Sequence, residues 1–530
     1  MNKFLENAIL YEIYPSSFYD SNGDGIGDLA GITEKLEYVK SLGANLIWIN
    51  PFFLSPFRDG GYDISDYYKV DPRFGTMQDF EMLVKKCKEL KIKIIIDLVI
   101  GHTSIEHPWF KESAKKERNK YSDYFIWTDS VFASYKDKTI QGMYDRDGGY
   151  VINYYACQPA LNYGFLDMGY PNNNELNQNW KIHYLDKRLE PLRNEIIKIM
   201  KFWMDKGIDG FRVDLASSLV KKDYGDFRDE EEERIKGIKW LWKKLMEGIK
   251  KYYPDTIFLA EWVCPKVSVG KCGFDFDYIA HDCEPYNTLF RYEKDTNILP
   301  IFEKGKNYFS HEGKGDISRF IAYVKDVLST IEGKGYFSCP TGYHDIIRIA
   351  NGVKDNEVMK TVFAFILTFK NIPFVYHGDE IGIKHNYSIR KDGGGIRTGC
   401  RTPMQWNNDK NRGFSKSDFP YLPTNNDKGI SVFEQENDPD SLLNAFRSLT
   451  KLRNHYSFLN ASADLEIIEA GYPLVFRRKD KSGSAIIAIN PSDNNYFKKI
   501  KYNEVLLTKN AEINGRNIEL KAQSYVVLKE

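Results

Sequence analysis

Eight short runs of β-forming residues recur between residues 9 and 380, and segments with helical periodicity separate them. Strands that alternate with helices favour a parallel sheet, because a helix must carry the chain back between parallel neighbours. Eight such strands close into a (β/α)8 TIM barrel, which is an α/β fold. The expected strands are residues 9–14, 46–50, 94–99, 211–214, 257–261, 274–277, 336–338 and 374–376.

The segment between the second and third runs shows the helical spacing most clearly. Phe80, Leu83, Val84 and Cys87 stand at positions i, i+3, i+4 and i+7. This pattern predicts a surface helix over residues 77–90 that covers the sheet.

The alternation fails after the third run, where residues 103–174 are rich in Asn, Gly and aromatic side chains. A structureless loop of that length is rare inside a compact domain, so we expect short strands within it. Loops that follow barrel strands build the active face of a TIM barrel. We therefore expect a loop-rich subdomain inserted at that face.

The last part of the chain shows short apolar alternations, such as SAIIAIN and SYVVLKE, bounded by turn residues. They predict a C-terminal antiparallel β-sandwich domain. A chain of 530 residues with 42% hydrophobic content is long enough for these parts. The expected division is a first barrel part at 1–102, the inserted subdomain at 103–174, a second barrel part at 175–455 and an all-β domain at 456–530.

Composition argues against two classes of partner. The 74 basic and 74 acidic side chains cancel, so no net field attracts nucleic acid or an anionic membrane. The longest apolar stretch, residues 362–369, is far shorter than the roughly 20 residues that cross a bilayer. The N-terminus lacks the features of a secretory signal, and the seven cysteines lack metal-ligand spacing. We expect a cytoplasmic protein with reduced thiols; nothing indicates its oligomeric state.

Polar side chains follow four of the expected strands, in the segments DLVIGH (97–102), GFRVD (210–214), FLAEW (258–262) and YHDIIR (343–348). Each segment alone could hold a structural ion pair. Together they place carboxylates at the end of the barrel where active sites lie. Retaining cleavage of an acetal needs a nucleophilic carboxylate and a carboxylic acid roughly 5–5.5 Å apart. Asp214 and Glu261 have the strand positions for that pair.

These segments resemble the signature regions of the α-amylase family of glycoside hydrolases. The opening YEIYPSSFYDSNGDGIGDLAGI and the later RTPMQW (401–406) are similar to the branch of oligo-1,6-glucosidases, α-glucosidases and trehalose synthases. The resemblance covers essentially the whole chain and implies the barrel, insertion and β-sandwich layout. It implies that Asp214 is the nucleophile, that Glu261 is the acid and base, and that Asp345 binds and distorts the sugar.

The resemblance also implies a set of substrate-binding residues. Tyr62 would stack on the glucose ring, and Asp59 with Arg401 would clamp its non-reducing end. The alternative for the clamp is an ordinary ion pair. The alternative for Asp214 is a structural salt bridge with the neighbouring Arg212. That arginine fits both interpretations, because a guanidinium next to a nucleophile lowers the pKa of its carboxyl and keeps it ionised at neutral pH. The full set is Asp59, Tyr62, His102, Arg212, His344 and Arg401.

The loop at residues 20–28 alternates oxygen-bearing residues with glycines, a pattern that suits a hard cation such as Ca²⁺. The resemblance implies a structural Ca²⁺ here and no organic cofactor. A Gly- and Asp-rich turn without metal is the alternative. The implied ligands are the side chains of Asp20, Asn22, Asp24 and Asp28 and the carbonyl of Ile26.

Four positions depart from the usual pattern of the family. Gly101 stands where Asn is typical, which removes an amide from the first motif, and Tyr343 stands where Asn usually precedes the histidine. Ala160 replaces the Asp that is usual in this branch, and Leu215 follows the nucleophile. These changes remove no catalytic group, but they leave open whether α-1,4 bonds, α-1,6 bonds or sucrose are cut.

Three functions remain after the sequence is considered. The first is a retaining exo-acting α-glucosidase that acts on short oligosaccharides through a covalent glucosyl-enzyme intermediate. The second is a transglucosidase or glucosyl isomerase, similar to a trehalose synthase, that uses the same intermediate. The third is a catalytically dead relative like the extracellular subunits of amino-acid transporters, which would lack the carboxylates and carry a membrane anchor.

Overall fold

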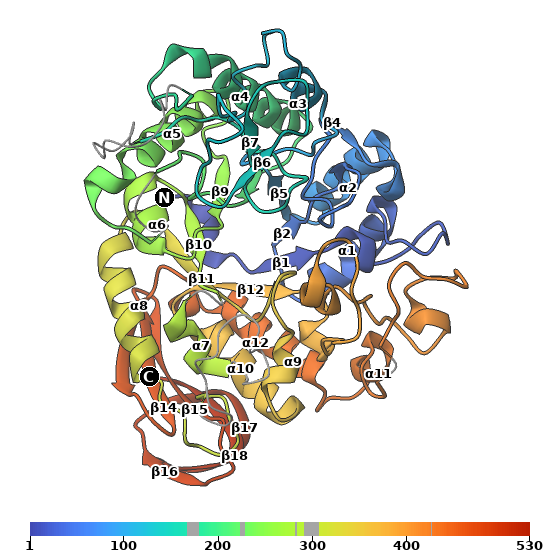
Figure 1. Cartoon of the computed structure of the whole chain (residues 1–530). Coiled ribbons are helices and arrows are strands. Elements are labelled where there is room, and N and C mark those ends of the chain that lie inside the picture. The colour runs from blue at the N-terminus through green and yellow to red at the C-terminus, as the bar shows by residue number, and fades with distance from the viewer. Residues whose placement is uncertain (167–179, 223–227, 281–282, 291–306, 426) are drawn as a thin grey trace.

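A computed structural model describes residues 1–166, 180–222, 228–280, 283–290, 307–425 and 427–530. Its centre is a closed barrel of parallel strands in the order β1-β12-β11-β10-β9-β8-β5-β2 (Figure 1). All eight strands expected from the sequence are confirmed. Their bounds are β1 (Leu10–Ile13), β2 (Leu46–Ile49), β5 (Lys93–Leu98), β8 (Gly210–Val213), β9 (Ile257–Ala260), β10 (Phe276–Tyr278), β11 (Tyr336–Pro340) and β12 (Ile372–Tyr376).

Helices cover the outside of the barrel, which is why its strands are buried on both faces. The expected helix after the second strand is α2 (Met77–Glu89), and its buried side chains are the four that the periodicity indicated. The other long helices are α1 (Leu29–Ser41), α4 (Glu190–Asp205), α5 (Glu232–Lys250), α6 (Pro265–Cys272), α8 (Ser318–Ile331), α10 (Asn356–Thr368) and α12 (Leu442–His455). Shorter helices are α7 (Glu284–Phe290), α9 (Ile349–Gly352) and α11 (Val432–Glu436).

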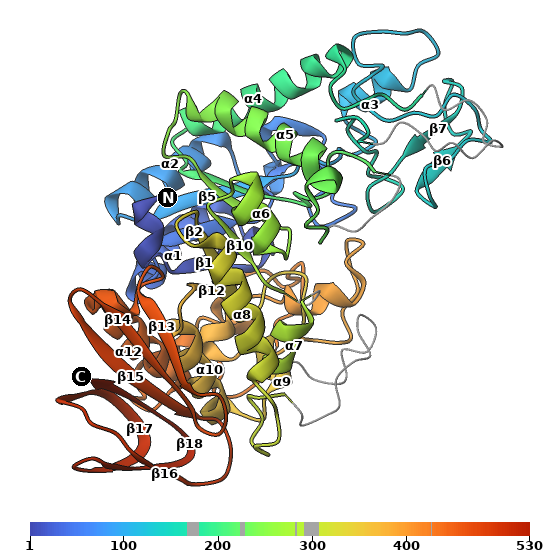
Figure 2. The same cartoon turned by 90° about the vertical axis from the view of Figure 1, so that its left-hand side faces the viewer.

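Two loops on the barrel carry short strands. β3 (Phe53–Leu54) and β4 (Asp66–Val70) pair after β2. The expected insertion between β5 and β8 holds α3 (Pro108–Ser113) and the hairpin β6 (Thr139–Gln141) with β7 (Gly149–Val151). Figure 2 shows it at the opposite end of the molecule from the C-terminal sheet. The expected boundary at residue 174 lies outside the described residues.

The expected antiparallel C-terminal domain is a six-stranded sheet, in which β17 pairs with β18 off the main order β13-β14-β15-β18-β16. Alternate residues of a strand point to opposite faces. In β15, Ile487 and Ile489 join the main core, whereas Ile486 and Ala488 join a separate cluster on the other face. The bounds are β13 (Asp464–Glu469), β14 (Leu474–Asp480), β15 (Gly483–Asn490), β16 (Tyr496–Lys499), β17 (Glu504–Asn514) and β18 (Asn517–Lys529).

Two buried arginines join the C-terminal part of the chain to the end of helix α10. Arg453 of α12 donates to Leu367 O at 2.9 Å, and Arg478 of β14 donates to Thr368 O at 2.6 Å. The last carbonyls of a helix lack partners within the helix and carry partial negative charge, so cations stabilise them. Arg478 therefore fastens the sheet to α10, and Arg453 fastens α12 to the same helix end.

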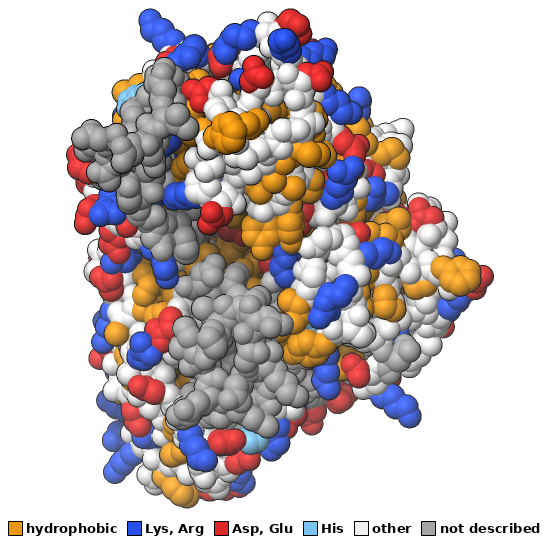
Figure 3. All heavy atoms as spheres, viewed as in Figure 1, with side chains coloured by type: hydrophobic (Ala, Val, Ile, Leu, Met, Phe, Trp, Pro, Cys, Tyr) orange, Lys and Arg blue, Asp and Glu red, His pale blue; other side chains and the backbone are white. Residues whose placement is uncertain are grey.

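The balanced charge and the short apolar stretches seen in the sequence are also found in the structure. Basic and acidic side chains are intermixed on the face shown in Figure 3. Among the described residues, none of the helices combines the length and the apolar character that a bilayer crossing requires.

Replacing Arg478 tests the junction between the sheet and the barrel. Arg478 also donates to Asn460 O at 2.5 Å and to Asp464 O at 3.1 Å. Arg478→Met leaves the buried Thr368 O without its donor, at a cost of about 1–3 kcal/mol, and removes two part-buried bonds, so we expect the free energy of unfolding to fall by roughly 1–3 kcal/mol. Thermal scans at one heating rate measure the loss.

The neighbouring Arg477→Met is the matched control. Arg477 pairs with Glu530 at 2.7 Å, and its side chain is 30% exposed. Exposed pairs contribute about 0–1 kcal/mol. Equal midpoints for the two variants would contradict the role assigned to Arg478.

Candidate active site

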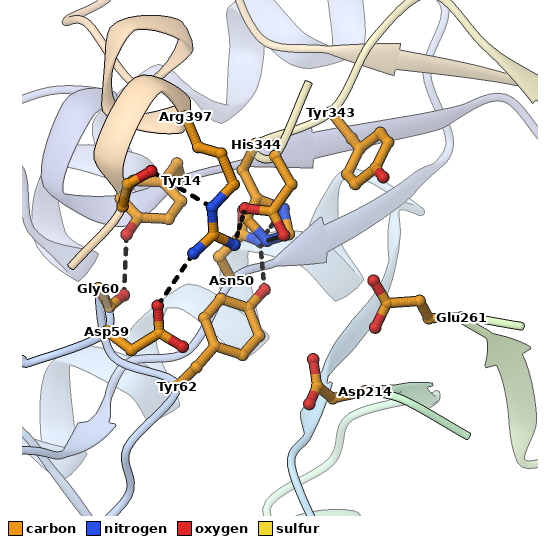
Figure 4. Close-up of polar contacts among 12 residues, drawn as sticks. Tyr14, Asn50, Asp59, Gly60, Tyr62, Asp214, Glu261, Tyr343, His344 and Arg397 are labelled. Carbon is orange, nitrogen blue, oxygen red and sulfur yellow. Dashed lines mark hydrogen bonds and ion pairs between the residues drawn. The ribbon is translucent and has the colours of Figure 1, made fainter. Parts of the chain in front are cut away.

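The carboxylates expected from the sequence meet at the carboxyl end of the barrel. Asp97 lies in β5, Asp214 directly follows β8, and Glu261 directly follows β9. These three strands are consecutive neighbours in the barrel, although they are far apart in the sequence. Figure 4 shows the side chains of Asp214 and Glu261 facing the same space. Asp345 reaches the site from the loop between β11 and α9.

Arg212 of β8 connects the first three carboxylates. Its guanidinium lies 2.5 Å from Asp97, 3.0 Å from Asp214 and 2.8 Å from Glu261. Burial and the charge of Glu261 raise the pKa of Asp214, and Arg212 lowers it only in part. One buried cation cannot balance three anions at low cost, so this cluster favours keeping a proton. Arg212 alone therefore does not set the charge of Asp214, contrary to the expectation from the sequence.

Each member of the carboxylate pair offers one oxygen to the protein. Arg212 and the N–H of Leu215 both donate to Glu261 Oε2, the latter at 2.9 Å. Leu215 has a left-handed φ of 44°, which costs a non-glycine residue on the order of 1–2 kcal/mol. That backbone conformation turns its N–H toward Glu261. Among the described residues, no hydrogen bond is made to Glu261 Oε1 or Asp214 Oδ2, so these oxygens are available for chemistry.

Asp345 is held by two arginines of one short segment. Arg397 and Arg401, within and at the end of the 3₁₀ helix η7 (Gly395–Cys400), donate to its Oδ1 at 3.0 and 2.6 Å. Burial alone would raise the pKa of Asp345, but Arg397, His344 and Arg401 hold that pKa well below its usual range. Asp345 is therefore an anion at neutral pH.

The direct partner of Asp59 differs from the expected one. Arg397, not Arg401, lies 3.3 Å from Asp59 Oδ1, and Gln158 donates to Oδ2 at 2.7 Å. Arg401 instead donates to His344 O at 2.9 Å and to Asp345. Asp59, Arg397 and Asp345 thus form a continuous ion-pair chain. Figure 4 shows Asp59 and Arg397 on one side of the site. The sequence reasoning missed Arg397, although it lies one turn before Arg401.

His344 and Tyr62 form a stacked pair. Their rings are 5.2 Å apart and inclined by only 9°. His344 Nδ1 lies 2.6 Å from Glu12 Oε1, and burial holds the pKa of His344 well below its usual value. Glu12 was not recognised from the sequence, although a charged residue in the otherwise apolar strand β1 was the signal.

His102 uses both ring nitrogens within the protein. Nε2 lies 3.0 Å from Tyr62 O, and Nδ1 lies 3.3 Å from the amide nitrogen of Asn153. Burial lowers the pKa of His102 to about 4, so the ring is neutral. The resemblance implied that His102 binds the sugar. In this structure, without a sugar, His102 is bonded to Tyr62 O.

The expected metal loop is closed by its own hydrogen bonds. Asp20 accepts from Gly23 N at 2.7 Å and Gly25 N at 2.8 Å, while Asp28 caps helix α1 by accepting from Gly31 N at 2.6 Å. Across the part of the chain that the structure describes, no three His, Cys, Asp or Glu side chains gather closely enough to hold a metal ion. The all-oxygen donor set fits Ca²⁺ chemically. Binding would require these oxygens to exchange N–H partners for the ion.

Of the unusual residues, Tyr343 lies beside the carboxylates and Ala160 does not. Tyr343 packs against Tyr278 and His344, with ring centres 5.4 and 5.7 Å apart. Ala160 is fully buried in the hydrophobic cluster of the inserted subdomain, and its backbone forms a β-bridge with His102.

Known proteins resemble this chain along nearly its whole length. A family model described as the α-amylase catalytic domain matches residues 12–462. The oligo-1,6-glucosidase of Heyndrickxia coagulans is 32% identical over 93% of each chain. The trehalose synthase/amylase of Mycolicibacterium smegmatis is 30% identical over 86% of this chain and 76% of its own. A mutant isomaltulose synthase of Erwinia rhapontici NX5, solved with D-glucose, superposes with a TM-score of 0.80, at 25% identity over 100% of this chain and 99% of its own.

Removing Arg397 tests the ion-pair chain through its pH dependence. A carboxylate whose pKa is depressed in the folded state stabilises the fold above its unfolded pKa of roughly 3.9 and loses that effect as the pH falls. Arg397→Met removes the strongest of the charges that lower the pKa of Asp345. The wild-type advantage in unfolding free energy should be largest above about pH 5 and should shrink toward pH 3.

Thermal midpoints of both proteins between pH 3 and pH 7 measure this difference. Arg390→Met is the control, because Arg390 is exposed in the same segment and donates only to the carbonyls of Tyr387 and Ile389. A gap between wild type and Arg397→Met that stays constant with pH would refute the ion-pair chain.

Proposed function

The chain belongs to the α-amylase family of glycoside hydrolases, and from this we propose that it is a retaining, exo-acting α-glucosidase. It would hydrolyse the terminal α-glucosidic bonds of short oligosaccharides. The observation that carries the exo specificity is the ion-pair chain of Asp59, Arg397 and Asp345. We propose that it closes one wall beside the carboxylate pair and admits only a sugar with a free end.

The two free carboxylate oxygens divide the chemistry. Asp214 Oδ2 would attack the anomeric carbon of glucose and form a covalent glucosyl-enzyme, while Glu261 protonates the departing oxygen. Glu261 would then take a proton from a water molecule as the water oxygen attacks the anomeric carbon. The bond between that carbon and Asp214 breaks, and glucose is released with retained configuration. The buried carboxylate cluster around Arg212 favours holding one proton, and the first step requires this proton on Glu261 while Asp214 is ionised.

Asp345 would bind the glucose rather than react with it. Its Oδ1 is occupied by two arginines, so its charge is kept while its second oxygen faces His344 Nε2 at 3.5 Å. An anion fixed in this way accepts hydrogen bonds from sugar hydroxyls. Those bonds strengthen as the ring distorts toward the transition state.

Transfer to a second sugar is the alternative function. The trehalose synthase/amylase relative is 30% identical over most of this chain, and a solved isomaltulose synthase shares its fold. A sugar hydroxyl that reaches the glucosyl-enzyme before water gives a new disaccharide by the same chemistry. Leu215 and Tyr343, beside the catalytic pair, are the residues we propose to set this balance.

A substrate panel tests the proposal. Incubation with maltose, isomaltose, sucrose, maltotriose and starch, followed by chromatography, should show glucose release from short substrates and almost no cutting of starch. Rapid internal cutting of starch without free glucose would exclude the exo mode. New disaccharides at high sugar concentration would favour transfer, whereas hydrolysis products alone would exclude it.

Loss of the nucleophile provides the companion test. Asp214→Ala should lower turnover by a factor on the order of 10⁴ or more, as removal of a catalytic nucleophile does elsewhere. Asp205→Ala is the control, because Asp205 is half exposed at the end of α4. Unchanged turnover in Asp214→Ala would favour the catalytically dead relative.

Calcium binding at residues 20–28 is a separate proposal, supported by the oxygen donors of that loop and their spacing. The ion would be structural and would pin the loop between β1 and α1. A chelator should lower the thermal midpoint, and Ca²⁺ at about 100 times its Kd should restore about 2.7 kcal/mol. In Asp24→Ala the midpoint should no longer respond. An unchanged wild-type midpoint would end this proposal.

A cytoplasmic location is also proposed. All seven cysteines are free, and six of them are buried. Buried free thiols persist where the surroundings are reducing. Fractionation of the native host, with the protein found outside the cell, would contradict it.

A further inference from the structure

Gly101 leaves a space that another part of the chain fills. A Cβ added at residue 101 would lie 2.7 Å from the amide nitrogen of Asn153, closer than real Cβ contacts come. The φ angle of Gly101 is not in the left-handed region, so its backbone does not require glycine. The neighbour Asn153 is what excludes a side chain there.

Asn153 is buried and bonded at both ends of its amide. Lys221 Nζ donates to its Oδ1 at 2.7 Å, and its Nδ2 lies 3.3 Å from His102 Nδ1. Burial lowers the pKa of Lys221 to about 7, so its charge alone does not fix which end of the amide is oxygen. Tyr62 O can only accept and lies 3.0 Å from His102 Nε2, so the neutral ring carries its proton on Nε2 and accepts at Nδ1. The amide N–H₂ must then face His102, and the amide oxygen faces Lys221.

This orientation stabilises one tautomer of His102. Because Asn153 donates to Nδ1, that nitrogen is unprotonated, and the ring proton lies on Nε2. Nε2–H then donates to Tyr62 O at 3.0 Å. Tyr62 in turn stacks on His344. The orientation of His102 therefore affects the position of Tyr62, the residue expected to stack on the sugar.

The turn that carries Asn153 also holds the ion-pair chain. Asn153 N donates to Gln158 O at 3.2 Å, which closes the turn. Gln158 donates to Asp59, and the hydroxyl of Tyr155 lies 3.2 Å from Arg397 Nη2. One turn of the inserted subdomain therefore touches three separate parts of the site.

We propose that Asn153 is a positioning residue of this active site, which supplies from the inserted subdomain the amide that the first motif lacks at Gly101. It holds His102 as the Nε2–H tautomer and thereby fixes Tyr62. The effect on catalysis rests on the proposed function, whereas the effect on His102 does not.

Asn153→Asp separates this role from simple structural support. The two side chains have nearly the same shape, but the carboxylate of the variant keeps the bond to Lys221 and cannot donate to His102 Nδ1. The ring must then carry a proton on Nδ1, either in the other tautomer or as a cation, since a carboxylate favours the charged form. Long-range ¹H–¹⁵N spectra of protein with ¹⁵N-labelled histidine report this change without substrate, and a His102→Gln sample assigns the signal.

The same variant should lower kcat/KM for an α-glucoside about tenfold, which corresponds to roughly 1.4 kcal/mol. Asn119→Ala is the matched control, because Asn119 bonds within the same subdomain to Glu112 O at 2.7 Å and lies outside the site. The control should lower the thermal midpoint without moving kcat/KM or the histidine signal. An unchanged His102 signal in Asn153→Asp would overturn the proposal, whether or not the protein cleaves glucosides.

Exchange of the two positions is the rescue experiment. Gly101→Asn alone should impair kcat/KM, because its side chain meets Asn153. Asn153→Ala alone should impair it by leaving His102 without its donor. The double variant Gly101→Asn/Asn153→Ala should recover by a factor of about five or more over the worse single variant, which corresponds to roughly 1 kcal/mol. A double variant no better than that single variant would show that the two positions do not share one amide.

Discussion

A single buried guanidinium organises the catalytic end of the barrel. Arg212 meets carboxylates from three consecutive strands, β5, β8 and β9, and each would be costly to bury without it. The barrel must therefore close with these strand ends in register. A shift of one strand would separate its carboxylate from Arg212 and leave a buried charge without its partner. Three carboxylates around one guanidinium also favour a proton shared among them, with an ionised carboxylate beside it. The proposed mechanism needs this combination of one acid and one anion.

Local patterns in the sequence were enough to predict the barrel and to place Asp214 and Glu261 side by side. Strand and helix periods depend on residues close in the chain, and GFRVD and FLAEW end at strands that must be neighbours. The partners of Asp59 and His102 could not be found in this way. Arg397 and Arg401 lie one turn apart, and only the packed structure decides which reaches Asp59; Asn153 meets His102 across 51 positions of the chain. Those contacts have no local signature.

The site is built by three segments that make different contacts. The barrel strands supply the carboxylates around Arg212, η7 supplies the arginines that bind Asp345, and the turn at 153–158 contacts Asp59 and His102. In the proposed function, the groups that break the bond and the residues that select the glucoside would therefore lie in separate parts of the chain.

The contact of Arg453 and Arg478 with the end of α10 has a consequence for how this chain evolves. Helix α10 leads into β12, the strand that closes the barrel against β1. Through Arg478 the C-terminal sheet therefore contacts the helix next to the seam of the barrel, and Arg453 of α12 binds the same helix end. A sheet exchanged by gene fusion or recombination would need an arginine at the position of Arg478, because the buried carbonyl of Thr368 would otherwise lose its donor.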